Sequence, residues 1–278
     1  MTGLTFRTAS AAELPTILSW ASAEGWNPGL EDAACFHASD PSGFFVAIID
    51  DTPVAAISVV NHTETLAFLG LYLCLPSYRG KGIGYGLWQH AISHAGERTI
   101  GLDGVPDQQG NYQKSGFVLT GRTFRYEGDV VLEGAIPMRP ATRDDHPGII
   151  ALDAEACGYA KSAFMSNWLT HTANRETFVI DDREGLRAFA TIRRCARGAK
   201  IGPFTARDIG AAKGLLAAIA LRWPDRPLIV DIPDNQTELT TLAVEAGMTA
   251  TFNTARMYRG KPPNPGQVVA AAGTLELG

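Results

Sequence analysis

The sequence predicts an α/β protein of the α+β type, with two domains in tandem that each hold a mixed, mostly antiparallel sheet flanked by helices. The observations behind this are a chain of 278 residues, enough for two domains of about 100 to 150 residues, an internal repeat, and a strand and helix pattern in the first copy. We expect domains at residues 1–133 and 134–260. Residues 261–278, rich in proline and small residues, are predicted to be a flexible tail.

The internal repeat is seen at both ends of the unit. Phe6–Ala9 lines up with Met138–Ala141 at an offset of 132 residues, and Gly116–Arg125 lines up with Gly247–Arg256 at an offset of 131. Nearly equal offsets at opposite ends indicate two copies of one domain.

The first copy can be divided into elements in order. Ala9–Ala23 has the pattern of an amphipathic helix, and Glu24–Gly29 follows as a loop. Later elements are a helix at Glu31–Ala38, strands at Phe44–Asp50, Val54–Val60 and Leu66–Leu75, a helix through Leu87–Ile92, a strand at Thr99–Leu102, a helix at Gln108–Ser115 and a strand at Phe117–Tyr126. Because a helix joins the strands at Leu66–Leu75 and Thr99–Leu102, we expect these two to be parallel, with a ligand at their carboxyl ends.

Composition narrows the class of protein. Hydrophobic residues make up 45% of the chain, charged residues 19%, and the net charge of −5 offers no general attraction to nucleic acid. The four cysteines are scattered, and the sequence has neither an apolar leader nor eighteen consecutive apolar residues. We expect a cytoplasmic monomer or homodimer that acts on small molecules, without a membrane or nucleic-acid partner.

The stretch Leu69–Gly86 organises the first copy. Its apolar run passes into four alternating glycines at Gly80, Gly82, Gly84 and Gly86. Glycines expose bare backbone amides, and a following helix presents its positive end, so the stretch predicts a site for a phosphate or pyrophosphate.

Two motifs resemble those of a known family. Arg79-Gly-Lys-Gly82-Ile-Gly84 matches the acyl-CoA signature of the GCN5-related N-acetyltransferases (GNAT), and Tyr112-Gln-Lys-Ser-Gly116-Phe117 matches their second diagnostic segment. The whole chain resembles a bacterial subfamily that carries two such domains in tandem. The resemblance implies an enzyme that transfers acetyl from acetyl-CoA to a small amine.

The resemblance also implies where acetyl-CoA binds. The amides from Arg79 to Gly84 would hold the pyrophosphate, and the backbone of Leu73–Leu75 would pair with the pantetheine arm as an added strand does. The expected cofactor-binding residues are Leu73, Cys74, Leu75, Arg79, Gly80, Lys81, Gly82, Ile83, Gly84 and Asn111.

In such enzymes the amine attacks the thioester directly, and Tyr112 is expected to be the general acid that protonates the leaving thiolate. A phenol stays protonated at neutral pH, as this role requires. Glu24, Trp26, Asn27 and Asp103 are expected to bind the acceptor. The proton acceptor is left open between Glu24, Asp103 and a chain of water molecules. No metal is expected, because His90 and His94 lack a third ligand.

The second copy departs from the motifs. Arg207–Ala212 keeps the spacing of the acyl-CoA signature, but the alternating glycines are missing and Asp208 adds a carboxylate. The position of the catalytic tyrosine falls on Ala243. We therefore expect a degenerate second domain.

Two other function classes stay open. One is an acyl-CoA sensor without catalysis. The other is a nucleotide-binding protein, which the spacing disfavours because neither glycine frame completes G-x-G-x-x-G.

Overall fold

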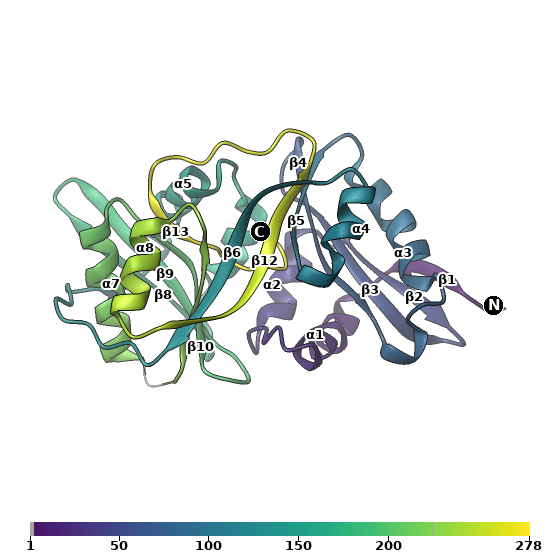
Figure 1. Ribbon diagram of the computed structural model, residues 1–278. Coiled ribbons are helices and arrows are strands. Elements are labelled where there is room, and N and C mark those ends of the chain that lie inside the picture. Colours follow the sequence, from purple (N-terminus) through teal and green to yellow (C-terminus); the bar gives the residue numbers. More distant parts are fainter. Residues whose placement is uncertain (1–2, 224) are drawn as a thin grey trace.

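One continuous sheet spans both copies of the repeat in the computed structural model, which describes residues 3–223 and 225–278 (Figure 1). Within these residues the strand order is β1-β2-β3-β4-β5-β12-β6-β11-β10-β9-β8-β7, and β13 pairs with β10. We call residues 3–133 the first half, residues 134–260 the second half and residues 261–278 the C-terminal segment.

The first half confirms the predicted elements to within a few residues. Its strands are β1 (Thr5–Thr8), β2 (Phe44–Ile49), β3 (Thr52–Asn61), β4 (Leu66–Cys74), β5 (Thr99–Gly104) and β6 (Val118–Gly128), and its helices are α1 (Leu14–Ala23), α2 (Asp32–Ser39), α3 (Ile83–Ile92) and α4 (Gln109–Lys114). Strands β4 and β5 are parallel, as expected from the helix that joins them.

The second half repeats the same series of elements. Its strands are β7 (Arg139–Pro140), β8 (Arg175–Asp182), β9 (Gly185–Arg194), β10 (Ala199–Ala206), β11 (Leu228–Pro233) and β12 (Thr249–Arg259), and its helices are α5 (His146–Cys157), α6 (Ser162–Trp168), α7 (Ile209–Arg222) and α8 (Thr237–Glu245). The correspondence of β4 with β10 and of α3 with α7 confirms the internal repeat.

The two halves exchange their last strands. Strand β12, which ends the second half, pairs with β5, while β6, which ends the first half, pairs with β11. Strands β6 and β12 also pair with each other, and Figure 1 shows them crossing between the halves. Each half therefore completes its sheet with a strand of the other.

Helices cover the sheet in two layers. Helices α3 and α4 pack on one face of the first half through Leu87, Trp88 and Tyr112. On the opposite face α1 and α2 meet α5 and α6 of the second half, where Phe36 stacks on Trp168 with ring centroids 6.1 Å apart. The halves thus share a hydrophobic core, and α7 and α8 cover the remaining face of the second half.

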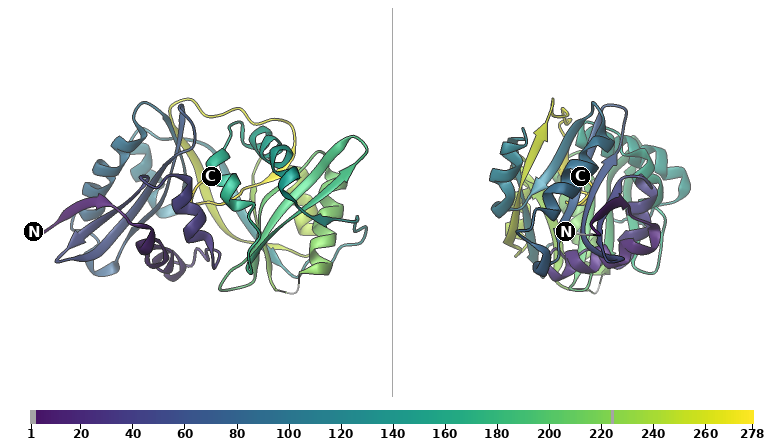
Figure 2. Two further views of the ribbon diagram at one scale, coloured as in Figure 1. Left: turned by 180° about the vertical axis from the view of Figure 1, so that it is seen from behind. Right: turned by 90° about the vertical axis from the view of Figure 1, so that its right-hand side faces the viewer.

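The C-terminal segment is a correction to the sequence prediction of a flexible tail. It contains β13 (Val269–Ala271), which pairs with Phe204–Ala206 of β10, and Leu277 has no exposed surface. In the left view of Figure 2 the chain end marked C lies between the halves. Four consecutive apolar residues, Val268–Ala271, give it enough buried surface to order the proline-rich run before them.

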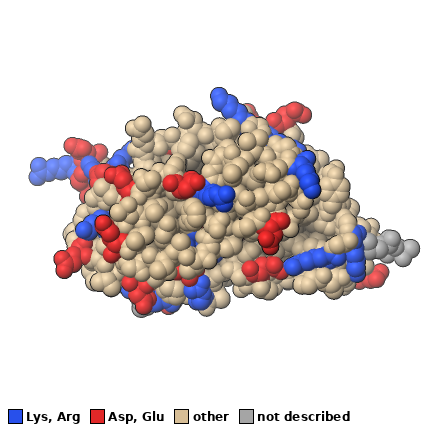
Figure 3. Space-filling view, in the orientation of Figure 1, with Lys and Arg blue, Asp and Glu red and all other residues tan. Residues whose placement is uncertain are grey.

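Charges of both signs are interspersed on the face seen in Figure 3, over both halves. Among the described residues, none of the helices is both long and apolar enough to span a bilayer.

Candidate active site

A groove opens in the first half where two parallel strands separate. Leu66–Leu69 of β4 pairs with Thr99–Leu102 of β5, but β4 continues to Cys74 beyond the end of this pairing. On this side the backbone of the expected pantetheine-binding residues, Leu73–Leu75, has no partner in β5. A peptide-like chain could add to this edge as a strand would.

A β-bulge shapes the start of the groove. Ala56 pairs with Leu73 and Ser58 with Gly70, so that Leu71 and Tyr72 together face Ile57. Leu71 has φ of 47°, a strained conformation for a branched residue that is common at functional sites. The bulge removes one residue of β4 from the regular ladder at the point where the cavity begins, so its backbone groups are available to a ligand.

The glycine stretch lies at the start of α3, where the sequence predicts an anion site. Gly82 is the N-cap residue with φ of 78°, and no side chain caps the helix. A Cβ atom at Gly80 or Gly82 would meet nothing within 4 Å, so both glycines face open space. Gly84 has a different role, because a Cβ atom there would lie 2.9 Å from the Tyr72 hydroxyl. The helix amides are thus accessible to a phosphate.

Tyr112 of α4 lies beside this groove. Its ring stacks on Trp88 with centroids 5.6 Å apart, and it is 7% exposed. Burial raises the pKa of the Tyr112 phenol above its ordinary value, and the charge of Tyr72 adds to the shift. Burial likewise raises the pKa of Tyr72 to about 12. Both hydroxyls therefore stay protonated at neutral pH and can donate hydrogen bonds.

A cavity of about 60 Å³ joins these features at the centre of the molecule. Residues from both halves and from the C-terminal segment line it, among them Leu71, Tyr72, Asp103, Tyr112, Arg125 and Glu276. Tyr112 and the bulge in β4 therefore face a common space.

Two buried ion pairs flank this cavity and reflect the strand exchange. Arg125 of β6 donates to both carboxylate oxygens of Asp231 on β11, at 2.8 and 2.9 Å. Arg256 of β12 donates to both oxygens of Asp103 on β5, at 2.9 and 2.7 Å. Burial alone would raise the pKa of Asp231, but the guanidinium of Arg125 lowers it below its ordinary value.

The other expected site residues are separated from one another. Glu24 bonds to Arg79 and does not line the cavity. Trp26 does line it, and its carbonyl accepts hydrogen bonds from Arg125 and Lys200. Glu24 is thus at a distance from the groups that the cavity brings together.

Three further expected residues make contacts away from the cavity. Asn27 bonds to the backbone of Arg197 in the second half, Asn111 is exposed and bonds to Gln108, and Lys81 lies over the Tyr78 ring, 5.4 Å from its centroid. Of the acids predicted for the acceptor site, Asp103 alone reaches the cavity, where Arg256 holds it.

Sequence reasoning missed Leu71, Tyr72, Arg125 and Glu276. The internal repeat could have marked Arg125, because Arg256 occupies the same position in the second half at an offset of 131 residues. The repeat also relates Gly70 to Gly202, at an offset of 132 residues, and the C-terminal segment lies close to the backbone at both glycines. No local pattern marked Glu276.

In the second half the corresponding groove is filled by the chain itself. Strand β10 pairs with β11 over Ala199–Ile201 and then separates from it, and β13 takes the free edge of β10. Asp208 caps α7 by accepting a hydrogen bond from the amide of Ala211 at 2.8 Å. A cavity of about 330 Å³ remains beside β13, with Tyr159 and Arg256 in its wall.

Both halves match known acetyltransferases in sequence. The profile of the acetyltransferase (GNAT) family matches residues 11–117, and that of the acetyltransferase (GNAT) domain matches residues 149–268. The chain belongs to the GNAT family, with two GNAT domains in tandem.

Individual relatives agree with this assignment. Over 278 residues the chain is 34% identical to a holothin acyltransferase from Pseudoalteromonas sp. (strain SANK 73390), covering 99% of this chain and 94% of the relative. A crystal structure of a candidate acetyltransferase from Pyrococcus horikoshii shares the fold with a TM-score of 0.84 at 19% identity, over 100% and 97% of the two chains. The tandem GNAT protein from the clavulanic acid biosynthesis pathway has a TM-score of 0.64 at 14% identity, over 95% and 100%.

Proposed function

We propose that this protein is an N-acetyltransferase that transfers acetyl from acetyl-CoA to a small amine, with a single active site in the first half. The observation that carries the proposal is the groove between β4 and β5, which has the uncapped start of α3 at one side and Tyr112 at its inner end. The relative named for acylation of holothin aligns over the whole chain, which supports a small-molecule acceptor.

Each part of the groove has a role in this proposal. The amides at Gly82 and beyond bind the pyrophosphate, and the free edge of β4 binds pantetheine. The bulge at Leu71 supplies backbone donors for the thioester oxygen. As the amine nitrogen bonds to the acyl carbon and the C–S bond breaks, the Tyr112 phenol gives its proton to the CoA sulfur.

The proposal is tested by titrating the full chain with acetyl-CoA in a calorimeter and by following CoA release with a panel of amino acids, polyamines and heterocyclic amines. We expect one acetyl-CoA per chain and release that depends on an amine. Tight binding without any amine-dependent release would favour the acyl-CoA sensor, and failure to bind acetyl-CoA would reject the site itself.

A further inference from the structure

The carboxylates near the cavity differ in whether they are free to accept a proton. Both oxygens of Asp103 are bonded to Arg256, and Thr254 adds a third hydrogen bond at 3.3 Å. Asp231 is held in the same way by Arg125. Neither acid can take a proton from a substrate without breaking a buried ion pair.

Glu276 of the C-terminal segment is the exception. It lines the cavity and is 4% exposed, so its carboxylate is removed from bulk water. Among residues 3–223 and 225–278 its side chain makes neither a hydrogen bond nor an ion pair. A buried carboxylate in this state retains its full capacity to bind a donor from a ligand.

The fold places Glu276 by a close backbone approach. The carbonyl oxygen of Glu276 lies 1.9 Å from the position that a Cβ atom would take at Gly70 of β4. Any larger residue at Gly70 would collide with it. The segment therefore runs directly against the strand that carries the bulge at Leu71.

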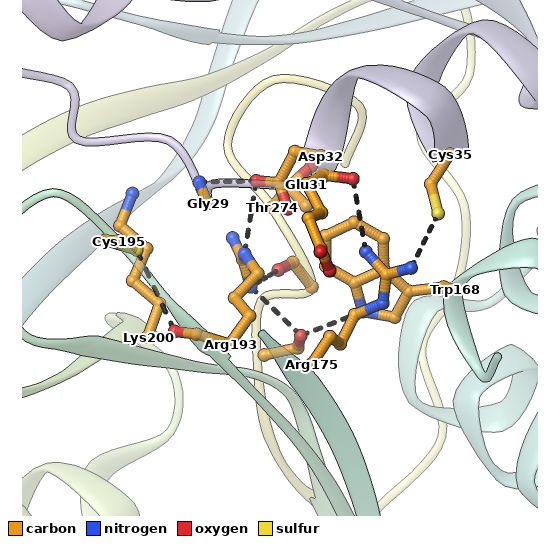
Figure 4. A network of polar contacts seen from close by, with 12 residues as sticks. Gly29, Glu31, Asp32, Cys35, Trp168, Arg175, Arg193, Cys195, Lys200 and Thr274 are labelled. Carbon is orange, nitrogen blue, oxygen red and sulfur yellow. Dashed lines mark hydrogen bonds and ion pairs between the residues drawn. The ribbon is translucent and has the colours of Figure 1, made fainter. Parts of the chain in front are cut away.

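Anchors on both sides of Glu276 fix the segment. Before it, Arg193 donates to the carbonyl of Gly273 at 3.4 Å and pairs with Asp32, in the network of Figure 4 that includes Thr274. After it, His62 bonds to the carbonyl of Leu277 at 2.7 Å and Lys161 to that of Gly278 at 2.8 Å. A side chain held between such anchors loses little entropy when it binds a substrate.

The charged groups around Glu276 come from three strands. Its negative charge favours the protonated forms of Arg125 on β6, Arg193 on β9 and Lys200 on β10, and so opposes the effect of burial on the pKa of each. Two of these cations already have a carboxylate partner, Asp231 for Arg125 and Asp32 for Arg193. Lys200 donates to the carbonyl of Trp26 at 2.9 Å.

We propose that Glu276 is the proton acceptor of the transfer reaction, which rests on the proposed function. The carboxylate hydrogen-bonds the acceptor amine and takes one proton from its nitrogen as the C–N bond forms. Tyr112 gives one proton to the sulfur as the C–S bond breaks. Exchange with solvent returns the proton from Glu276 and restores the phenol of Tyr112, so the products are the amide and CoA.

The test compares Glu276→Gln with the wild-type chain across pH, using the amine identified in the acceptor panel. Glutamine keeps the shape of the side chain but cannot take a proton. We expect kcat/KM to fall about 10² to 10⁴-fold at pH 7, and acetyl-CoA binding to stay unchanged. The ratio of wild-type to variant kcat/KM should shrink as the pH rises, because hydroxide in the solvent can then take the proton that glutamine cannot.

Three outcomes would overturn the assignment. They are a kcat/KM within about 3-fold of wild type at pH 7, a loss of kcat/KM that is equal at all pH values, and a Glu276→Ala variant as active as wild type, since alanine removes the carboxylate. The alanine variant decides the question if Glu276→Gln does not fold. Glu245→Gln, an exposed position on α8, is the matched control and should match wild type. If the wild-type chain releases no CoA with any amine, the proposed function fails, which differs from an active chain that tolerates Glu276→Gln.

Discussion

The two halves carry the same elements in the same order but differ at the start of one helix. In the first half Gly82 leaves the amides of α3 uncapped, while in the second Asp208 bonds to the amide of Ala211 at the start of α7. An anion can reach the first helix. At the second, the carboxylate already occupies the amides and would repel a phosphate.

The grooves of the two halves also differ in whether the backbone along their edge is free to bind a ligand. The edge of β4 beyond Leu69 has no partner in β5, whereas the matching edge of β10 is taken by β13. Backbone that a pantetheine arm would pair with in one half is therefore paired with the protein's own chain in the other. The two halves thus keep the same fold while the edge of one strand is free and the matching edge is paired within the chain.

The largest expected effect concerns a tyrosine hydroxyl in each of the two cavities, that of Tyr112 in the first and that of Tyr159 in the second. Tyr112→Phe should lower kcat by about 10² to 10⁴-fold with little change in acetyl-CoA affinity, because the thiolate loses its proton donor. Tyr159→Phe, in the second cavity, should leave kcat unchanged, since its hydroxyl is buried without a hydrogen-bond partner among the described residues. Steady-state CoA release measures both variants. A Tyr112→Phe enzyme with wild-type turnover would contradict the difference between the halves.

The next effect concerns the ion pairs Arg125–Asp231 and Arg256–Asp103, each of which joins an exchanged strand to the other half. Arg125→Met and Arg256→Met should each lower the free energy of unfolding by about 3 to 5 kcal/mol, because each leaves a buried aspartate without its partner. Urea denaturation should show a single transition in both variants. A loss below about 1 kcal/mol in either one would mean that the two pairs are not equivalent.

A smaller effect concerns His62 and Lys161, which bind the carbonyl groups of Leu277 and Gly278 in the C-terminal segment. Burial lowers the pKa of His62 to about 4, while Asp153 overcomes burial and raises the pKa of Lys161. Between about pH 6.5 and pH 4 the unfolded chain binds a proton at His62 that the folded chain does not, so stability falls as pH is lowered through this window. The expected loss is on the order of 2 kcal/mol, less than the full shift implies because His62 is only partly buried.

His62→Gln keeps a donor for Leu277 but does not titrate, so it should flatten this part of the pH dependence. Urea denaturation at pH 7 and pH 4.5 measures the difference for both chains. Equal slopes in the variant and the wild-type chain would assign the pH dependence to other groups.

The smallest expected effect comes from exchanging the N-cap residues of α3 and α7, which are Gly82 and Asp208. Gly82→Asp should weaken acetyl-CoA binding about 10-fold, because it adds a charge and a side chain at positive φ where the pyrophosphate would bind. Asp208→Gly should cost only a few tenths of a kcal/mol and should not create a second site, since β13 still fills the groove. Calorimetric titration of both variants measures these effects. Two acetyl-CoA molecules bound to Asp208→Gly would show that the cap alone closes the second half.

Much of the site was predictable because its signals are local. The glycines at 80 and 82 predicted an anion site, and the structure places both facing open space at the start of α3. The order of strands and helices could be derived from periodicity. The two family profiles and the relative that is 34% identical confirm the family. The role of Tyr112 stays a prediction, as do those of the acceptor residues.

The elements, the repeat and the family could be derived from the sequence alone, because propensity, periodicity and motif spacing act over a few residues. The pairing of strands across the halves and the course of the C-terminal segment became known from the three-dimensional structure. These depend on contacts between residues far apart in the chain, such as Gly70 with Glu276 and Arg125 with Asp231. A run of prolines predicts flexibility locally, but the groove beside β10 provides hydrogen bonds and apolar surface that order the residues after the prolines.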